Sequence, residues 1–109
     1  MTWKIDYFNE DLQGEILNFP ETILARYIKL TEIMKDHGAD IGMPHTKALG
    51  KGLFELRLKG KEGIARVFYC TIIGKQIYML HSFIKKTNKI PNKELTLAKN
   101  RMREVKKNG

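Results

Sequence analysis

Three β-like runs joined by very short connections constrain the fold of this chain more than any other feature. The runs are LFELRLK (53–59), IARVFYCTII (64–73) and QIYMLHSFI (76–84). The first alternates apolar and polar side chains, and the other two are rich in β-branched and aromatic residues. The turn sequences between them are GKEG (60–63) and Gly74-Lys75. Because connections this short join antiparallel neighbours, the sequence predicts a three-strand meander.

The segments before the meander predict a strand and two helices. WKIDYF (3–8) reads as a short strand, and Asn9 is a good N-cap for a helix over EDLQGEIL (10–17). A second helix starts after Pro20 and ends at Gly38, with apolar residues between at helical spacing. Residues 39–52 contain one proline and three glycines and are expected to be irregular.

A basic helix closes the predicted order of elements. Pro91 precedes NKELTLAKNRMREVKK (92–107), whose apolar residues fall on one side. The order β-α-α-β-β-β-α predicts an α+β fold in one domain over residues 1–109, a small antiparallel-meander sheet packed against an N-terminal helical hairpin and a C-terminal helix. We expect one sheet face to remain free, with Arg57 on the polar face of its strand. Alternation does not assign the buried face of the Arg66 strand, because Phe68 and Cys70 share the parity of Arg66.

Charge is divided unevenly along the chain. Residues 1–43 hold four basic and eight acidic side chains, a balance of −4, whereas residues 44–109 carry a balance of +12, and the two together give the net charge of +8. Such a polarised domain can present one positive surface to a polyanion, and the phosphate of RNA or DNA is the first candidate.

Several other function classes lack their sequence signals. His37, His45 and His81 do not have the spacing of metal ligands, so no metal and no other cofactor is expected. The lone Cys70 sits in an apolar run and is expected to be buried. No apolar run is long enough to cross a membrane, and the acidic N-terminus is unlike a signal peptide, so a cytoplasmic protein is expected.

Four short motifs, in order along the chain, resemble one known family. They are GLFELR (52–57), RVFY (66–69), LHSFIKKT (80–87) and P-x-x-E-L-x-x-A-x-x-R (91–101). Together they resemble the RelE/HigB superfamily of toxins from type II toxin–antitoxin systems, in its phage-derived HigB-like branch. The resemblance implies the RelE-like microbial RNase fold.

The resemblance also implies an activity and its partners. Such toxins are mRNA interferases that enter the A site of the ribosomal 30S subunit and cleave the mRNA there. The ribose 2′-hydroxyl attacks the adjacent phosphate without a metal ion. A cognate antitoxin, usually a helix-turn-helix protein, neutralises the toxin. The chemistry needs a proton acceptor, a proton donor and cations that stabilise the charge growing on the phosphate.

The resemblance assigns roles to basic residues of this chain. Arg66 would clamp the scissile phosphate, and Arg57 would hold an adjacent one. Lys85 and Lys86 match a basic pair at the end of the sheet, where Lys86 would stabilise the transition state. RNA-binding roles fall to four further lysines, Lys47, Lys51, Lys59 and Lys89.

Ordinary structural roles compete with these assignments. Arg66 could form an ion pair with the acidic helices, Arg57 could pair with Glu55 or Glu62, and the lysines could serve only solubility.

One departure from the family puts the proton transfers in doubt. RelE has a catalytic tyrosine in its C-terminal helix, and Leu95 stands at about that position here. His81 is the substitute we consider first, because imidazole can donate or accept a proton near neutral pH. Tyr69 and Glu55 are weaker candidates. The missing tyrosine favours an alternative function, a non-catalytic nucleic-acid-binding regulator or degenerate toxin on the same fold. A relative that poisons gyrase is a third possibility.

Overall fold

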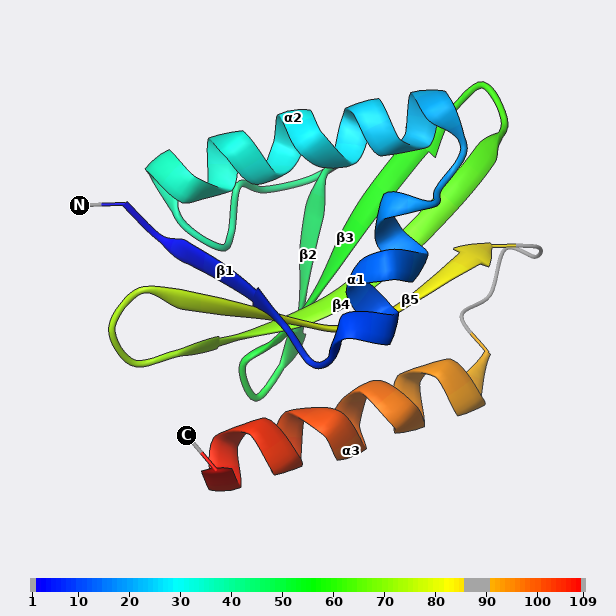
Figure 1. Cartoon of the computed structure of the whole chain (residues 1–109). Helices are drawn as coiled ribbons and strands as arrows, with labels where there is room; N and C mark the ends of the chain where they lie inside the picture. The colour runs from blue at the N-terminus through cyan, green and yellow to red at the C-terminus, as the bar shows by residue number, and fades with distance from the viewer. Residues whose placement is uncertain (1, 86–90, 109) are drawn as a thin grey trace.

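The protein was analysed as a computed structural model, which describes residues 2–85 and 91–108 (Figure 1). In chain order its elements are β1 (Lys4–Tyr7), α1 (Glu10–Leu17), α2 (Glu21–His37), β2 (Thr46–Gly50), β3 (Leu53–Gly60), β4 (Gly63–Ile72), β5 (Gln76–Lys85) and α3 (Asn92–Asn108). The predicted helices and the three predicted meander strands are therefore present, with bounds that differ by one or two residues.

Within the described residues, five strands form one sheet in the order β1-β5-β4-β3-β2. The strands β2 to β5 are antiparallel neighbours, which confirms the predicted meander, and β1 pairs in parallel with β5. The expectation that residues 39–52 are wholly irregular was wrong, because Thr46–Gly50 forms the edge strand β2. Positive φ angles at Gly50, Lys51 and Gly52 make the tight turn from β2 into β3.

The helix ends follow the sequence signals. The side chain of Asn9 accepts a hydrogen bond of 2.8 Å from the backbone N–H of Leu12, as expected of an N-cap. Gly38 ends α2 with a φ of 104°, a conformation that favours glycine. The end of α2 also lies beside the N-terminal segment, since the Trp3 N–H donates to the Lys35 carbonyl.

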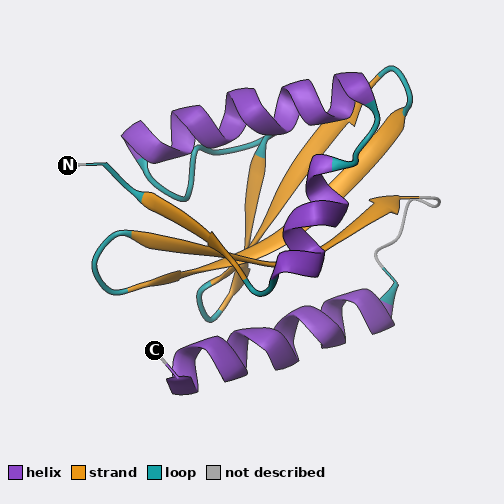
Figure 2. Cartoon of the chain, in the orientation of Figure 1, coloured by secondary structure: helices purple, strands orange, loops and turns teal. Residues whose placement is uncertain are grey.

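Helices cover both faces of the sheet. Figure 2 shows α1 and α2 on one side of the strands and α3 on the other. The larger core lies under α1 and α2 and includes Leu56, Val67 and Met79. The smaller core lies under α3 and includes Phe68 and Leu80. The expectation that one sheet face remains free was therefore wrong, because α3 occupies part of it.

Burial on both faces also explains the ambiguous pattern of β4. Val67 and Tyr69 point into the larger core, whereas Phe68 and Cys70 point into the smaller core under α3. Arg66 shares the parity of Phe68 and so lies on the α3 side of the sheet. The register between β4 and β5 shifts by one residue at this point, because Phe68 is opposite His81 whereas Tyr69 is opposite Met79. None of the helices in the described segments is long and apolar enough to cross a membrane.

We predict that truncation of Phe68 destabilises the fold strongly, because its ring is fully buried and packs beside Phe83, with ring centroids 5.6 Å apart. Phe68→Ala should lower the free energy of unfolding by about 3–5 kcal/mol in urea denaturation. The matched control is Leu97→Ala on the exposed side of α3, which should change it by less than about 0.5 kcal/mol. Equal effects of the two variants would contradict the packing of α3 on the sheet.

Candidate functional site

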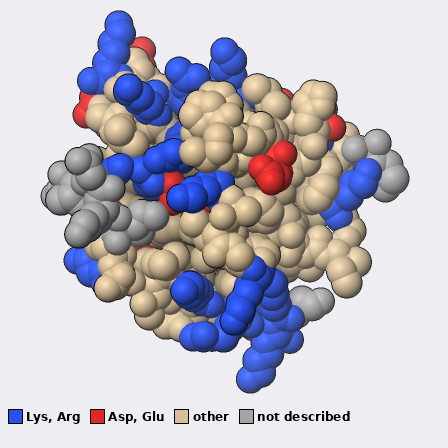
Figure 3. Space-filling view, turned by 180° about the vertical axis from the view of Figure 1, so that it is seen from behind, with Lys and Arg blue, Asp and Glu red and all other residues tan. Residues whose placement is uncertain are grey.

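Basic side chains gather on the side of the molecule that faces away in Figure 1. Figure 3 shows one group toward the β3–β4 hairpin and the middle of this face, and a second group along the lower edge, where α3 lies. The first group coincides with the polar ends of β3, β4 and β5.

The register of the sheet places two arginines side by side. Arg57 of β3 is directly opposite Arg66 of β4. Two residues further along the strands, Ile64 of β4 lies between Lys59 of β3 and Lys85 of β5. Side chains of directly opposed residues project from the same face, with Cβ atoms roughly 5 Å apart. The register thus brings together Arg57, Arg66, Lys59 and Lys85 from three strands.

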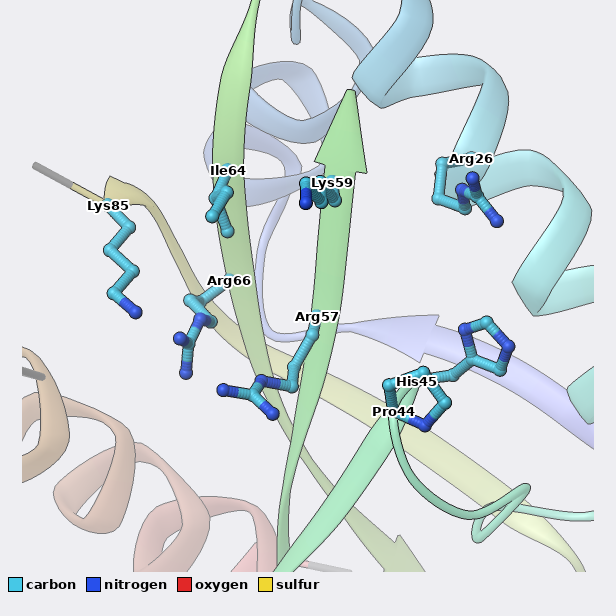
Figure 4. Close-up of a pocket in the computed structure, with 8 residues that line it drawn as sticks. All are labelled: Arg26, Pro44, His45, Arg57, Lys59, Ile64, Arg66 and Lys85. Carbon is cyan, nitrogen blue, oxygen red and sulfur yellow. The ribbon is translucent and has the colours of Figure 1, made fainter. Parts of the chain in front are cut away.

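These side chains line a cavity of about 410 Å³ (Figure 4). Its charged and polar lining residues are Arg26, His45, Arg57, Lys59, Arg66 and Lys85, and Pro44 and Ile64 complete the wall. Figure 4 shows the labelled residues grouped together, with Arg26 contributed by α2, Pro44 and His45 by the turn before β2, and the others by β3, β4 and β5. No acidic residue is among the described residues that line it. A cavity of this composition is suited to an anion.

Glu55 forms ion pairs with both arginines. The Glu55 carboxylate is 1% exposed, and its Oε1 accepts a hydrogen bond from Arg66 Nη1 and lies 3.4 Å from Arg57 Nε. The alternative that Arg57 pairs with Glu55 is thus confirmed, and the partner of Arg66 is this strand carboxylate and not the acidic helices. The side chain of Arg66 is only 5% exposed, whereas that of Arg57 is 35% exposed. Arg57 is therefore the more accessible guanidinium.

Lys85 completes the array at its β5 side. Loss of solvent contact, with the neighbouring positive charges of Arg66 and Arg57, lowers the pKa of Lys85 below its ordinary value. A lysine whose pKa is lowered releases its proton more readily. Lys85 is thus both a cation for an anionic ligand and a potential proton donor.

Two predicted catalytic residues lie outside this cavity. The Nε2 atom of His81 is hydrogen-bonded to Glu94 in the first turn of α3, and its ring stacks on Phe83. Tyr69 lies on the opposite sheet face, where its hydroxyl donates to the Ala39 carbonyl and burial raises its pKa above the ordinary value. The structure does not bring either side chain to the basic cluster.

The remaining predicted lysines are distributed differently. Lys59 lines the cavity, whereas Lys47 on β2 and Lys51 in the following turn are exposed outside it. The Lys51 carbonyl accepts a hydrogen bond of 3.2 Å from Lys106 Nζ on α3. Lys86 and Lys89 lie outside the described residues.

Two cavity residues were missed by the sequence analysis. Arg26 lies in the acidic half of the chain, and nothing in its helical pattern marks it as different from a solvated charge. His45 stood in a segment expected to be irregular. Recognising residues 46–50 as a strand would have placed His45 near Arg57, and that was the available signal. Among the described residues, no group of three or more His, Cys, Asp or Glu side chains is arranged to hold a metal ion.

Comparisons with known proteins agree with this architecture. The profile of the family described as phage derived protein Gp49-like (DUF891) matches residues 14–103. The structure is similar to the crystal structure of the archaeal RelE–RelB complex from Pyrococcus horikoshii OT3, with a TM-score of 0.58 and 17% sequence identity over 79% of this chain and 98% of that chain. This likeness confirms the expected RelE-like α+β fold. A search of curated proteins found no match.

We predict that the Glu55–Arg66 pair is strongly coupled, because both groups are buried and removal of one leaves the other charge without its partner. Glu55→Gln and Arg66→Met should each lower the free energy of unfolding by about 3–5 kcal/mol, measured by urea denaturation.

The double variant should lose clearly less than the sum of the two single losses. The control is Glu32→Gln, which breaks an exposed pair with Lys35 and should cost less than about 1 kcal/mol. Strictly additive losses for Glu55 and Arg66 would contradict the pairing.

Proposed function

The chain belongs to the Gp49-like family of phage-derived proteins, a RelE/HigB-type toxin family, and from this we propose that it is the toxin of a type II toxin–antitoxin pair that cleaves mRNA on the ribosome. The observation that carries the proposal is the pairing of Arg57 with Arg66 in a basic cavity large enough for a phosphate group and its riboses. Family membership alone would not distinguish a working site from a degenerate one.

The proposed reaction uses the cavity as a phosphate site. The 2′-oxygen of one ribose attacks the adjacent phosphorus, and the charge on the non-bridging oxygens increases in the transition state. Guanidinium groups suit this charge because their planar N–H donors can contact two oxygens at once. Arg57, which is more exposed, would make the principal contact, and Arg66 would contribute through its small exposed surface.

Lys85 and Lys59 have supporting roles in this proposal. Lys85 would protonate the leaving 5′-oxygen, a role favoured by its lowered pKa. Lys59 would contact the RNA backbone at the outer edge of the cavity. The exposed Lys47 and Lys51 would contact RNA further along β2 and its turn. These assignments require no bound cofactor.

The proposed partners follow from the family and the charge distribution. The ribosomal A site would supply the mRNA and bend it into the geometry for in-line attack, so free RNA should be a poor substrate. The reaction would take place in the cytoplasm, where the ribosomes are. A cognate antitoxin, of the helix-turn-helix type usual for this branch, would neutralise the toxin.

Two observations favour the second candidate function, a non-catalytic nucleic-acid-binding regulator. Glu55 neutralises part of the positive charge in the cavity and leaves Arg66 only 4% exposed. Leu95, at the approximate position of the RelE tyrosine, packs into the core under α3. A regulator would retain RNA or DNA binding without cleavage, so the cleavage assay below separates the two functions.

We predict that Arg57→Ala slows cleavage of a ribosome-bound message by about 100-fold or more, because it removes the accessible guanidinium from the phosphate site. Primer extension on a translated message, in single-turnover conditions, measures the rate. The control is Lys29→Ala, which removes one exposed positive charge from α2 and should leave the rate unchanged.

Wild-type protein that binds programmed ribosomes but leaves the message intact would contradict the nuclease and support the regulator. Cleavage by Arg57→Ala at the wild-type rate would contradict the proposed site.

A further inference from the structure

The backbone of His45 fixes its position relative to the arginines. Its N–H donates to the Gly42 carbonyl at 3.0 Å, and its carbonyl accepts from the Arg57 N–H at 2.8 Å. The second bond extends the β2–β3 pairing by one residue beyond Thr46 and Leu56, so His45 stands opposite Arg57. Opposed residues project from the same sheet face, which agrees with the presence of His45 in the cavity wall.

His45, in the turn just before β2, therefore forms a row with Arg57 of β3 and Arg66 of β4. Neighbouring Cβ atoms in such a row are roughly 5 Å apart. Lys85 of β5 lies beyond Arg66, one step further along the strands. His45 and Lys85 thus flank the two guanidinium groups from opposite sides, on strands roughly 14 Å apart across three strand spacings. Figure 4 shows this separation, with His45 and Lys85 at opposite margins of the group.

The chemistry of the other lining residues leaves one proton acceptor. Arg26, Arg57 and Arg66 have only N–H donors and retain their protons, and the ammonium groups of Lys59 and Lys85 are also donors. Only one oxygen of the Glu55 carboxylate, Oε1, is engaged by the arginines, and Oε2 is buried without a hydrogen-bond partner among the described residues. The carboxylate is 1% exposed, so an incoming 2′-hydroxyl does not reach it from the cavity. Among the described residues of the cavity wall, the imidazole of His45 is the side chain suited to accept a proton near neutral pH.

We propose that His45 is the catalytic base, which accepts the proton of the attacking 2′-hydroxyl. This inference rests on the proposed function and specifies a residue of the same site. As the bond from the 2′-oxygen to phosphorus forms, the bond from phosphorus to the 5′-oxygen breaks. The 2′-hydroxyl proton passes to His45, and the Lys85 ammonium supplies a proton to the 5′-oxygen. The products are a 2′,3′-cyclic phosphate and a 5′-hydroxyl, and exchange with water restores both side chains.

The placement of His45 and Lys85 on opposite sides of the arginines matches what an in-line displacement requires. The entering 2′-oxygen and the leaving 5′-oxygen occupy opposite sides of phosphorus, so the base and the acid must also stand on opposite sides. The guanidinium groups between them face the non-bridging oxygens, which carry the increased charge. His81 cannot take this role from its position, because Glu94 engages it outside the cavity wall.

Cations from several elements line the same cavity as His45. Arg26 comes from α2, Lys59 and Arg57 from β3, Arg66 from β4 and Lys85 from β5. The nearest acidic group along the chain, Asp40, accepts hydrogen bonds from the Gly42 N–H and the Thr46 hydroxyl. None of the five cations is an acceptor, so a rise of the cleavage rate with pH should come from His45.

The test compares His45→Gln with wild type in single-turnover cleavage of ribosome-bound message from pH 5.5 to 8.5. His45→Gln should cleave about 10²–10⁴-fold more slowly and lose the rise of rate with pH, while its affinity for programmed ribosomes stays within about twofold. His37→Gln, at the exposed end of α2, is the matched control and should behave as wild type. Thermal unfolding verifies the fold, and His45→Asn replaces His45→Gln if the latter unfolds early.

A substrate with a 5′-bridging sulfur separates the base from the acid, because a thiolate leaves without being protonated. This substrate should restore the rate of Lys85→Ala but not that of His45→Gln. Restoration of His45→Gln, or a wild-type rate and pH profile for this variant, would overturn the assignment. If Arg57→Ala abolishes cleavage while His45→Gln does not, only the base is wrong. If wild type does not cleave, the proposed function and this inference fail together.

Discussion

The ion pairs of Glu55 with Arg66 and Arg57 are the interaction on which the rest of the site depends. Two guanidinium groups on adjacent strands repel one another, and the carboxylate between them offsets that repulsion. Because Glu55 and Arg66 are nearly inaccessible to solvent, their attraction is weakly screened, and loss of one partner would leave a buried charge. The pairing also fixes the direction of the arginines. An anion therefore meets donors that are already in position, which is the physical basis of electrostatic catalysis.

The site exists because the α3 side of the sheet changes from apolar to basic residues along β3 and β4. On the α3 side, Leu53 is opposite Cys70, and both are covered by the helix. The next rows along β3 and β4 contain Glu55 opposite Phe68, then Arg57 opposite Arg66. The apolar rows hold α3 against the sheet, whereas the basic row opens into the cavity. Stability and function thus share one sheet face, and the buried Glu55–Arg66 pair contributes to both.

The sequence was sufficient for the elements whose signals are local. Asn9, Gly38 and the short turns between β3, β4 and β5 act within a few residues, and they predicted the helix ends and the meander. The cavity depends on contacts between distant segments. Alternation places Glu55 on the same strand face as Arg57, but it does not reveal that the Glu55 side chain is buried there. Arg26 and His45 reach the cavity only through the packing of α2 and the pairing of β2 with β3.

Catalysis at this site is expected to depend on the planar shape of the guanidinium donors and not only on their charge. Arg57→Lys retains a positive charge beside Glu55 but replaces the more exposed planar guanidinium with a point charge. The most direct measurement is the single-turnover rate at which this variant cleaves a ribosome-bound message, together with its affinity for the programmed ribosome. The account predicts unchanged affinity and a rate lowered about 100-fold, the loss typical of one preorganised donor. A rate within threefold of the wild-type rate would contradict it.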